Sequence, residues 1–240
     1  MREERGRGKR EEGRGTAGRR AGSSAMAGIA LVAAVMLGGC SLVGGSRDPA
    51  TIYAPTVMPA PDPAWPALDW QLSISRPEAS RVVGATRIAV RPVPGELQVY
   101  KGALWAKAPD EQLQDALLRE FEASGKLKAV ARQGSGMASD HRIELDLRRF
   151  DADYAGNAVP SATIEVGAML LGSENRGVIA SRAFAQAVPA AGTDPAQVSA
   201  AFGQALQAIA HDIAGWTLIE GQRLKDSGNS APSRPQAPPR

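Results

Sequence analysis

Hydrophobic and polar residues alternate along several short stretches of this chain. Because successive side chains of a strand point to opposite faces, this spacing predicts β-strands. The clearest stretch is 143–150, where aliphatic residues alternate with Arg142, Glu144, Asp146 and Arg148. One face of this strand is expected in the core, and the charged face at the surface. Alternation or short apolar runs predict further strands at 70–74, 88–93, 97–100, 127–132, 162–171 and 178–188.

Two other stretches carry apolar residues at intervals of three and four, which predicts amphipathic helices. The first spans 109–124, with Asp110 near its start and Gly125 just past its end as a C′ residue. The second begins at Asp194 and Pro195, which suit the N-cap and the first helical position. Its apolar stripe consists of Val198, Phe202, Leu206, Ile209, Ile213 and Trp216.

The order of these elements predicts a single two-layer α/β (α+β) domain over residues 69–222. Both helices are expected on one face of a mixed, mostly antiparallel sheet, and the loop 172–177 is expected to close a hairpin. Proline-rich segments flank this domain. Residues 40–68 contain six prolines and little periodicity, which predicts an extended tether. Residues 223–240 contain four prolines among small polar residues, which predicts a disordered tail.

Residues 1–39 have the organisation of a bacterial export signal. A basic stretch precedes the uncharged residues 27–37, which are followed by two glycines and Cys40. About eleven apolar residues fall short of the roughly 20 that a spanning helix needs. The sequence Leu-Gly-Gly-Cys resembles the lipobox of bacterial lipoproteins, which implies cleavage before Cys40 and lipidation of its thiol. The alternative is an ordinary buried cysteine, which leaves the basic flank unexplained.

Cleavage before Cys40 would change the charge of the protein. It removes eight of the 28 basic and four of the 25 acidic residues, so the formal net charge falls from +3 to about −1. The excess basicity belongs to the export signal, and we therefore exclude nucleic acid as a partner. Ser41 follows the cysteine at the position where Asp would resemble an inner-membrane retention signal. Ser41 thus favours sorting to the outer membrane.

Candidate chemistry is sparse in the rest of the chain. His141 and His211 have no second ligand at metal-binding spacing. The glycines at 134 and 136 lack the third glycine and the following helix of a dinucleotide-binding loop. We therefore predict no catalytic residue, no metal and no cofactor other than the covalent lipid on Cys40.

The acidic residues between positions 144 and 153 could be imagined as paired acids or a calcium site. On a regular strand, however, Asp151 and Asp153 would face away from Glu144 and Asp146. Arginines at 142 and 148 share the face of the latter two acids. A solvated, salt-bridged or partner-facing surface is the expectation for this strand.

Several segments, taken together with the lipobox, resemble the ABC-type transport auxiliary lipoproteins, a family that includes the PqiC-type lipoproteins. The resemblance covers roughly residues 70–222. It begins at Trp70-Gln-Leu72, where family members often have Tyr-x-Leu, and this difference leaves the role of Trp70 open. The other matching segments, in order, are Thr86–Val90, Leu113–Phe121 with Gly125–Leu127, Ile143–Phe150 with Asp151, Arg182–Phe184 and the Ala-rich helix through Trp216.

This resemblance implies a non-enzymatic lipoprotein at the outer membrane, facing the periplasm. Its implied partners are an MCE-domain substrate-binding protein and ABC transporter subunits that move phospholipid or another hydrophobic compound, and rings of identical copies are possible. Arg142, Glu144, Asp146 and Arg148 are the candidate partner-facing residues. Two alternatives stay open: an assembly or scaffold lipoprotein of another envelope complex, and a lipid-active enzyme.

Overall fold

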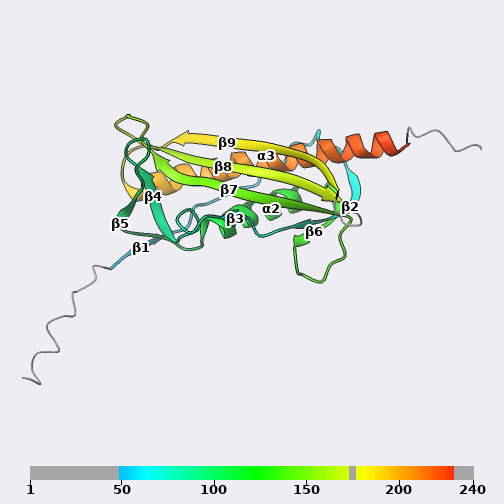
Figure 1. Ribbon diagram of the computed structural model, residues 1–240, viewed down its shortest axis with the longest axis horizontal. Helices are drawn as coiled ribbons and strands as arrows, with labels where there is room; N and C mark the ends of the chain where they lie inside the picture. The colour runs from blue at the N-terminus through cyan, green and yellow to red at the C-terminus, as the bar shows by residue number, and fades with distance from the viewer. Residues whose placement is uncertain (1–48, 173–176, 230–240) are drawn as a thin grey trace, which may run out of the picture. The chain divides into compact units, whose positions relative to one another are not determined.

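The computed structural model describes residues 49–172 and 177–229, where two helices lie against one nine-stranded sheet (Figure 1). Cys40 and Ser41 lie outside the described residues. The strands are β1 (Thr51–Tyr53), β2 (Leu68–Ile74), β3 (Glu78–Ala79), β4 (Arg87–Arg91), β5 (Gln98–Trp105), β6 (Leu127–Arg132), β7 (His141–Asp153), β8 (Ser161–Gly172) and β9 (Val178–Pro189). The helices are α2 (Pro109–Ser124) and α3 (Pro195–Asn229).

Strand β7 organises the sheet. Along one edge it pairs antiparallel with β8 over nearly its whole length, and β8 pairs antiparallel with β9, as the predicted hairpin requires. Along its other edge β7 pairs in succession with β2, β3 and β4, all in parallel. β6 extends the sheet beyond β2, while β5 and then β1 extend it beyond β4. The two longest ladders are antiparallel as predicted, although five of the eight pairings in the described part of the chain are parallel.

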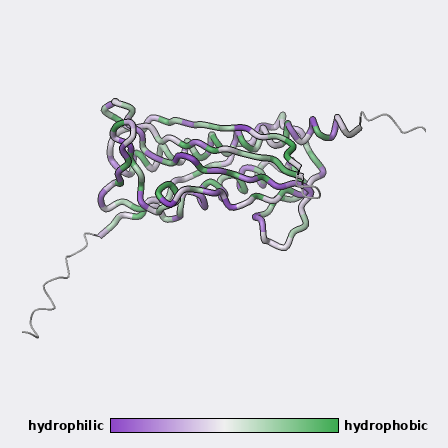
Figure 2. The backbone as a smooth tube through the Cα atoms, in the orientation of Figure 1, coloured by the Kyte–Doolittle hydropathy of each residue, from purple (hydrophilic) through white to green (hydrophobic). Residues whose placement is uncertain are grey.

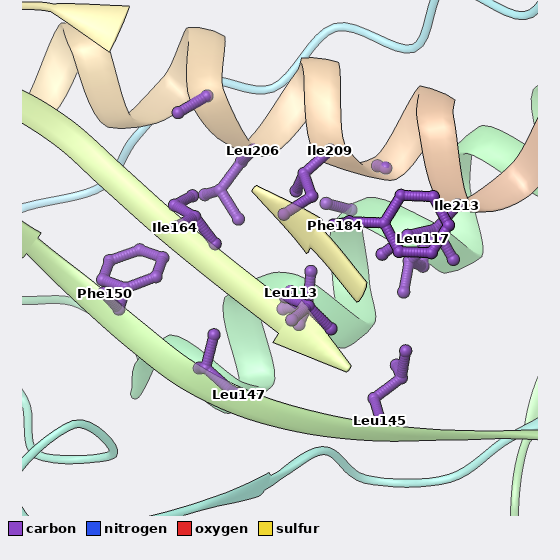
Figure 3. Packing of buried hydrophobic residues seen from close by; sticks show 14 of the residues in the cluster. Leu113, Leu117, Leu145, Leu147, Phe150, Ile164, Phe184, Leu206, Ile209 and Ile213 are labelled. Atoms are coloured by element: carbon purple, nitrogen blue, oxygen red, sulfur yellow. The ribbon is translucent and has the colours of Figure 1, made fainter. Parts of the chain in front are cut away.

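Both helices cover the same face of the sheet, which confirms the two-layer prediction (Figure 1). Hydrophobic and hydrophilic residues are interleaved along the strands (Figure 2), and the hydrophobic ones of β7 and β8 point toward the helices (Figure 3). Leu147 of β7, Leu113 of α2 and Ile209 of α3 are almost completely buried in this layer. Phe150 stacks on Phe202 of α3 with ring centroids 4.5 Å apart. Each such side chain contributes about 1.5–3 kcal/mol by leaving water.

The helix ends have the predicted chemistry. Gly125 follows α2 with φ of 59°, the left-handed conformation that a residue without Cβ adopts at little cost. At the start of α3, the Asp194 carboxylate accepts the backbone N–H of Ala196 at 2.8 Å. No helix within the described ranges is both long and apolar enough to cross a membrane.

The predicted tether is wrong for residues 51–68. β1 pairs with β5 in parallel, Trp65 is only 8% exposed, and Leu68 begins a strand in the sheet. The prolines suppress the periodicity that reveals a strand or helix, but they do not prevent the segment from packing against its neighbours. The tail prediction is also wrong at its start, because α3 continues past residue 222 to Asn229.

Candidate docking face of the sheet

The face of the sheet that points away from the helices carries all four predicted partner-facing residues. On β7, Ile143 and its alternate neighbours are buried against the helices, which leaves Arg142, Glu144, Asp146 and Arg148 on the opposite face. Arg142 pairs with Glu144 at 2.9 Å, and Arg148 pairs with Asp146 at 2.9 Å. This face is called the outer face below.

A β-bulge reverses the alternation of β7 part-way along. Residues 147 and 149 pair with consecutive residues of β8, so Arg148 is the extra residue. Beyond it, Phe150 and Ala152 become the core positions. Asp151 and Asp153 therefore lie on the outer face with Glu144, and the sequence-based prediction that they face the opposite way is wrong. Because the side chains of a strand alternate with a period of two, one extra residue moves every later side chain to the opposite face of the sheet.

Arg149 joins three carboxylates beyond the bulge. Its guanidinium donates to Asp151 at 2.8 Å, to Asp153 at 2.7 Å and to Glu165 of β8 at 3.0 Å. Arg91 of β4 donates to Asp151 as well, at 3.2 Å. The hydrogen bond with Asp151 is the largest cause that raises the pKa of Arg149. Burial raises the pKa of Asp153, but bonds from Arg149 and from a backbone N–H outweigh it and bring the pKa below its ordinary value of 3.8.

A groove of about 800 Å³ lies over the part of the outer face that precedes the bulge. In its lining, Gly167 of β8 pairs with Ala183 of β9, so two small residues lie side by side. The Arg148 guanidinium lies across Gly167, and a Cβ atom there would stand 2.6 Å from Nη2 of the arginine. The lining includes Arg76, Glu78, Glu144, Asp146, Arg148, Met169, Val178 and Arg182. The groove thus offers both signs of charge beside two small residues.

The two histidines occupy separate places, and neither adjoins a metal site within the described residues. The ring of His141 lies 3.8 Å from that of Trp70, and burial lowers its pKa. Trp70 therefore takes part in a ring contact with the first residue of β7. Nδ1 of His211 lies 2.9 Å from the carbonyl oxygen of Ala60 and 3.5 Å from the buried carboxylate of Glu120. His211 thereby contacts the segment that precedes β2.

This N-terminal segment (residues 54–66) is the feature that sequence reasoning missed. It crosses α2 and α3, where the Glu120 carboxylate accepts the N–H of Ala60 at 3.1 Å. A Cβ atom on Gly203 of α3 would stand 2.5 Å from the carbonyl oxygen of Thr56, and one on Gly215 would stand 2.9 Å from the Trp65 ring. The unexplained signals in the sequence were Trp65 in a proline-rich stretch and glycines within an otherwise good helix.

Comparison with known proteins assigns most of this domain to a family. The chain matches the family model of the ABC-type transport auxiliary lipoprotein component over residues 51–214. The chain belongs to this family. The resemblance inferred from the sequence is thereby confirmed, and the matched range begins at β1, inside the segment that had been predicted to be a tether. As a member of this family, the protein is an auxiliary lipoprotein of ABC-type transport in the cell envelope.

Solved structures support the fold of the auxiliary lipoprotein. A crystal structure of a protein from Xanthomonas campestris is 51% identical, with a TM-score of 0.71, and covers 74% of this chain and 99% of its own. A crystal structure of an uncharacterized protein, 14% identical with a TM-score of 0.55, covers 70% of this chain and 97% of its own and shares the fold.

A sequence relative is known as well. An uncharacterized protein of Bradyrhizobium diazoefficiens is 28% identical over 158 residues, which are 65% of this chain. The match spans 42% of that relative's length.

Proposed function

We propose that this protein is a non-enzymatic component of an MCE-type ABC transport system that moves phospholipid or another hydrophobic compound between membranes. A lipid on Cys40 anchors it in the outer membrane, with the domain facing the periplasm. There it docks the MCE-domain substrate-binding protein through the outer face of the sheet. Family membership supports the transport role, and the lipobox and Ser41 support the anchor and its location.

The observation that carries the docking role is the composition of the outer face. Within the described residues both helices lie on the other side of the sheet, so no helix covers this face (Figure 1). In the ion pair of Asp146 with Arg148, both side chains are more than half exposed. An exposed pair contributes only about 0–1 kcal/mol to stability, so the two charges can exchange partners at little cost. A face of alternating charges selects a complementary partner and excludes others.

The outer face over β7, β8 and β9 supplies a large part, but not all, of the area that a docking surface needs. β8 and β9 are each twelve residues long, which corresponds to about 40 Å. Three strands about 4.8 Å apart then give a strip of roughly 550 Å². A stable interface takes about 800 Å² from each partner. We therefore expect the partner to reach past β9 or onto the Arg76 side of the groove.

The ion pairs that the acidic residues of the outer face form argue against the alternative that the protein is a lipid-active enzyme. A general acid needs a carboxyl group whose pKa is raised towards neutrality. The pKa of Asp153 is instead lowered by its hydrogen bonds to Arg149 and the backbone. Glu144 and Asp146 each face an arginine at 2.9 Å. The outer face therefore suits recognition better than acid–base chemistry.

The edge strand β9 supports a second contact, between copies of this protein. Among the described strands, β9 pairs only with β8, so one side of its backbone is available for a further strand. Head-to-tail pairing of this edge with β1 or β6, the strands at the other ends of the sheet in the next copy, is a route to a homo-oligomeric ring.

Photocrosslinking in cells tests the docking proposal. A photoreactive amino acid replaces Met169, which lines the groove, and a matched variant carries it at Gln204, an exposed position on α3. We expect position 169 to capture an MCE-domain protein and position 204 to capture little. Capture of a different envelope complex at 169 would instead support the scaffold alternative. Capture of the MCE-domain protein at 204 alone would place docking on the helical face and refute the proposed surface.

A further inference from the structure

One end of the domain exposes aliphatic side chains on two turns. The turn between β4 and β5 carries Val93 and Leu97, and Val99 follows at the start of β5. The turn between β7 and β8 carries Val159. These four side chains are between 37% and 49% exposed. Isolated exposed aliphatics are ordinary on a protein surface, but a cluster of them marks a contact site.

The two turns leave the sheet side by side. Arg91, the last residue of β4, pairs with Asp153, the last residue of β7. The N–H of Tyr154 then donates to the carbonyl oxygen of Arg91 at 3.0 Å. A groove of about 480 Å³ is lined by Pro94 from one turn and Ala155 from the other. Both turns thus belong to one tip, and Figure 1 shows them at the end of the sheet where β1 lies.

The chain reaches the domain at this same end. β1 pairs with the second half of β5, Thr51 opposite Ala103. Ten residues separate Cys40 from Thr51, which span at most about 40 Å when fully extended. The β8–β9 hairpin extends about 40 Å away from this end, so we expect an anchor on Cys40 to hold the β1 end nearer the bilayer than the far end of the hairpin.

We propose that this tip contacts the phospholipid surface in which the lipid on Cys40 is inserted. Val93, Leu97, Val99 and Val159 leave water at the boundary between headgroups and acyl chains. The proposal rests on lipidation of Cys40, which is part of the proposed function. Its consequence is an orientation: β7, β8 and β9 stand away from the bilayer, and the groove on the outer face opens sideways, where a partner in the periplasm can reach it.

Fluorescence quenching by lipids tests this contact on the lipidated full-length protein. The sequence has one cysteine, and lipidation consumes it, so Val93→Cys or Val159→Cys introduces the only free thiol. Each variant is labelled with an environment-sensitive dye and reconstituted into vesicles of phosphatidylethanolamine and phosphatidylglycerol. Some of these lipids carry a nitroxide on the acyl chain. Val178→Cys is the matched control, because Val178 is 60% exposed and lies at the opposite end of the sheet.

We expect the dyes at 93 and 159 to lose fluorescence to the nitroxide lipids and to emit at shorter wavelength, while the dye at 178 does neither. Equal quenching and equal emission wavelength for the dyes at all three positions would overturn the proposal. The mass of the N-terminal peptide is measured first, so that the two possible failures stay separate. A protein without lipid refutes the anchor and with it the proposed location. A lipidated protein with unquenched dyes at 93 and 159 refutes only the contact of the tip.

Discussion

The guanidinium of Arg148 lies across the backbone of Gly167 on the neighbouring strand, with Nη2 2.6 Å from where a Cβ atom would stand. The same side chain pairs with Asp146 through Nε at 2.9 Å. Arg148 is the extra residue of the β-bulge in β7. Its position in the lining of the groove therefore depends on two local features: a bulge that inserts the arginine and a glycine that leaves room for it.

Replacing this glycine tests the arrangement. In Gly167→Ala the new methyl group occupies the place of the guanidinium, so Arg148 must swing away from the groove. Only the end of a flexible side chain has to move, so the free energy of unfolding should change by no more than about 1 kcal/mol. Capture of the partner from position 169 should fall. Urea unfolding and photocrosslinking measure the two effects, and unchanged capture would show that the place of Arg148 is irrelevant to docking.

Two adjacent arginines should differ in their contribution to stability. Arg149→Ala leaves the buried Asp151 with only Arg91 as a partner and should cost about 3 kcal/mol. Arg148→Ala removes an exposed pair and should cost less than about 1 kcal/mol. The free energy of unfolding in urea, measured under the same conditions, compares them. Equal losses would mean that the cluster around Arg149 contributes no more than a surface pair.

The same cluster should contribute to acid denaturation. Because the pKa of Asp153 in the folded protein lies below its ordinary 3.8, the folded state binds its proton less readily than the unfolded chain. The stabilisation is present above the unfolded pKa and is lost as the pH falls through the folded pKa. Asp153→Asn should therefore flatten the loss of stability between about pH 5 and pH 2. Thermal melts of both proteins across this pH range measure the effect. If the melting temperatures of the two proteins fall in parallel as the pH is lowered, the effect is excluded.

Gly203 should be required for the N-terminal segment to lie on α3. The Cβ atom of Gly203→Ala would stand 2.5 Å from the carbonyl oxygen of Thr56, and a backbone atom cannot move aside alone. Overpacking of this kind costs about 1–3 kcal/mol, against a gain in helix propensity of at most about 1 kcal/mol. We expect a lower melting temperature and faster proteolysis within 54–66. The neighbouring exposed substitution Gln204→Ala should change stability by less than about 0.5 kcal/mol.

Cys40→Ala should separate anchoring from folding. Cys40 lies outside the described domain, so the circular dichroism of the variant should match that of the parent. The variant should remain unprocessed or leave its normal membrane, and it should take up no fatty-acid label. Normal labelling would show that the lipid is attached elsewhere.

The sequence by itself determined the elements whose signal is local. Apolar residues three and four positions apart predicted a helix over 109–124, and α2 has the same bounds. Asp194 and Gly125 cap the helix ends as predicted. The alternation over 143–147 correctly placed Arg142, Glu144 and Asp146 on one face. Periodicity succeeds in these places because each residue's environment repeats along its own element.

Only the tertiary structure decided which edge each strand joins and where the alternation breaks. Nothing in the sequence marks Arg148 as an extra residue, because a bulge depends on the partner strand's register. The order of β2, β3 and β4 along one edge of β7 is likewise set by packing between distant segments. The N-terminal segment 54–66 has no period of its own, and its place depends on residues far along the chain: Glu120 accepts the N–H of Ala60, and glycines of α3 leave room for the segment.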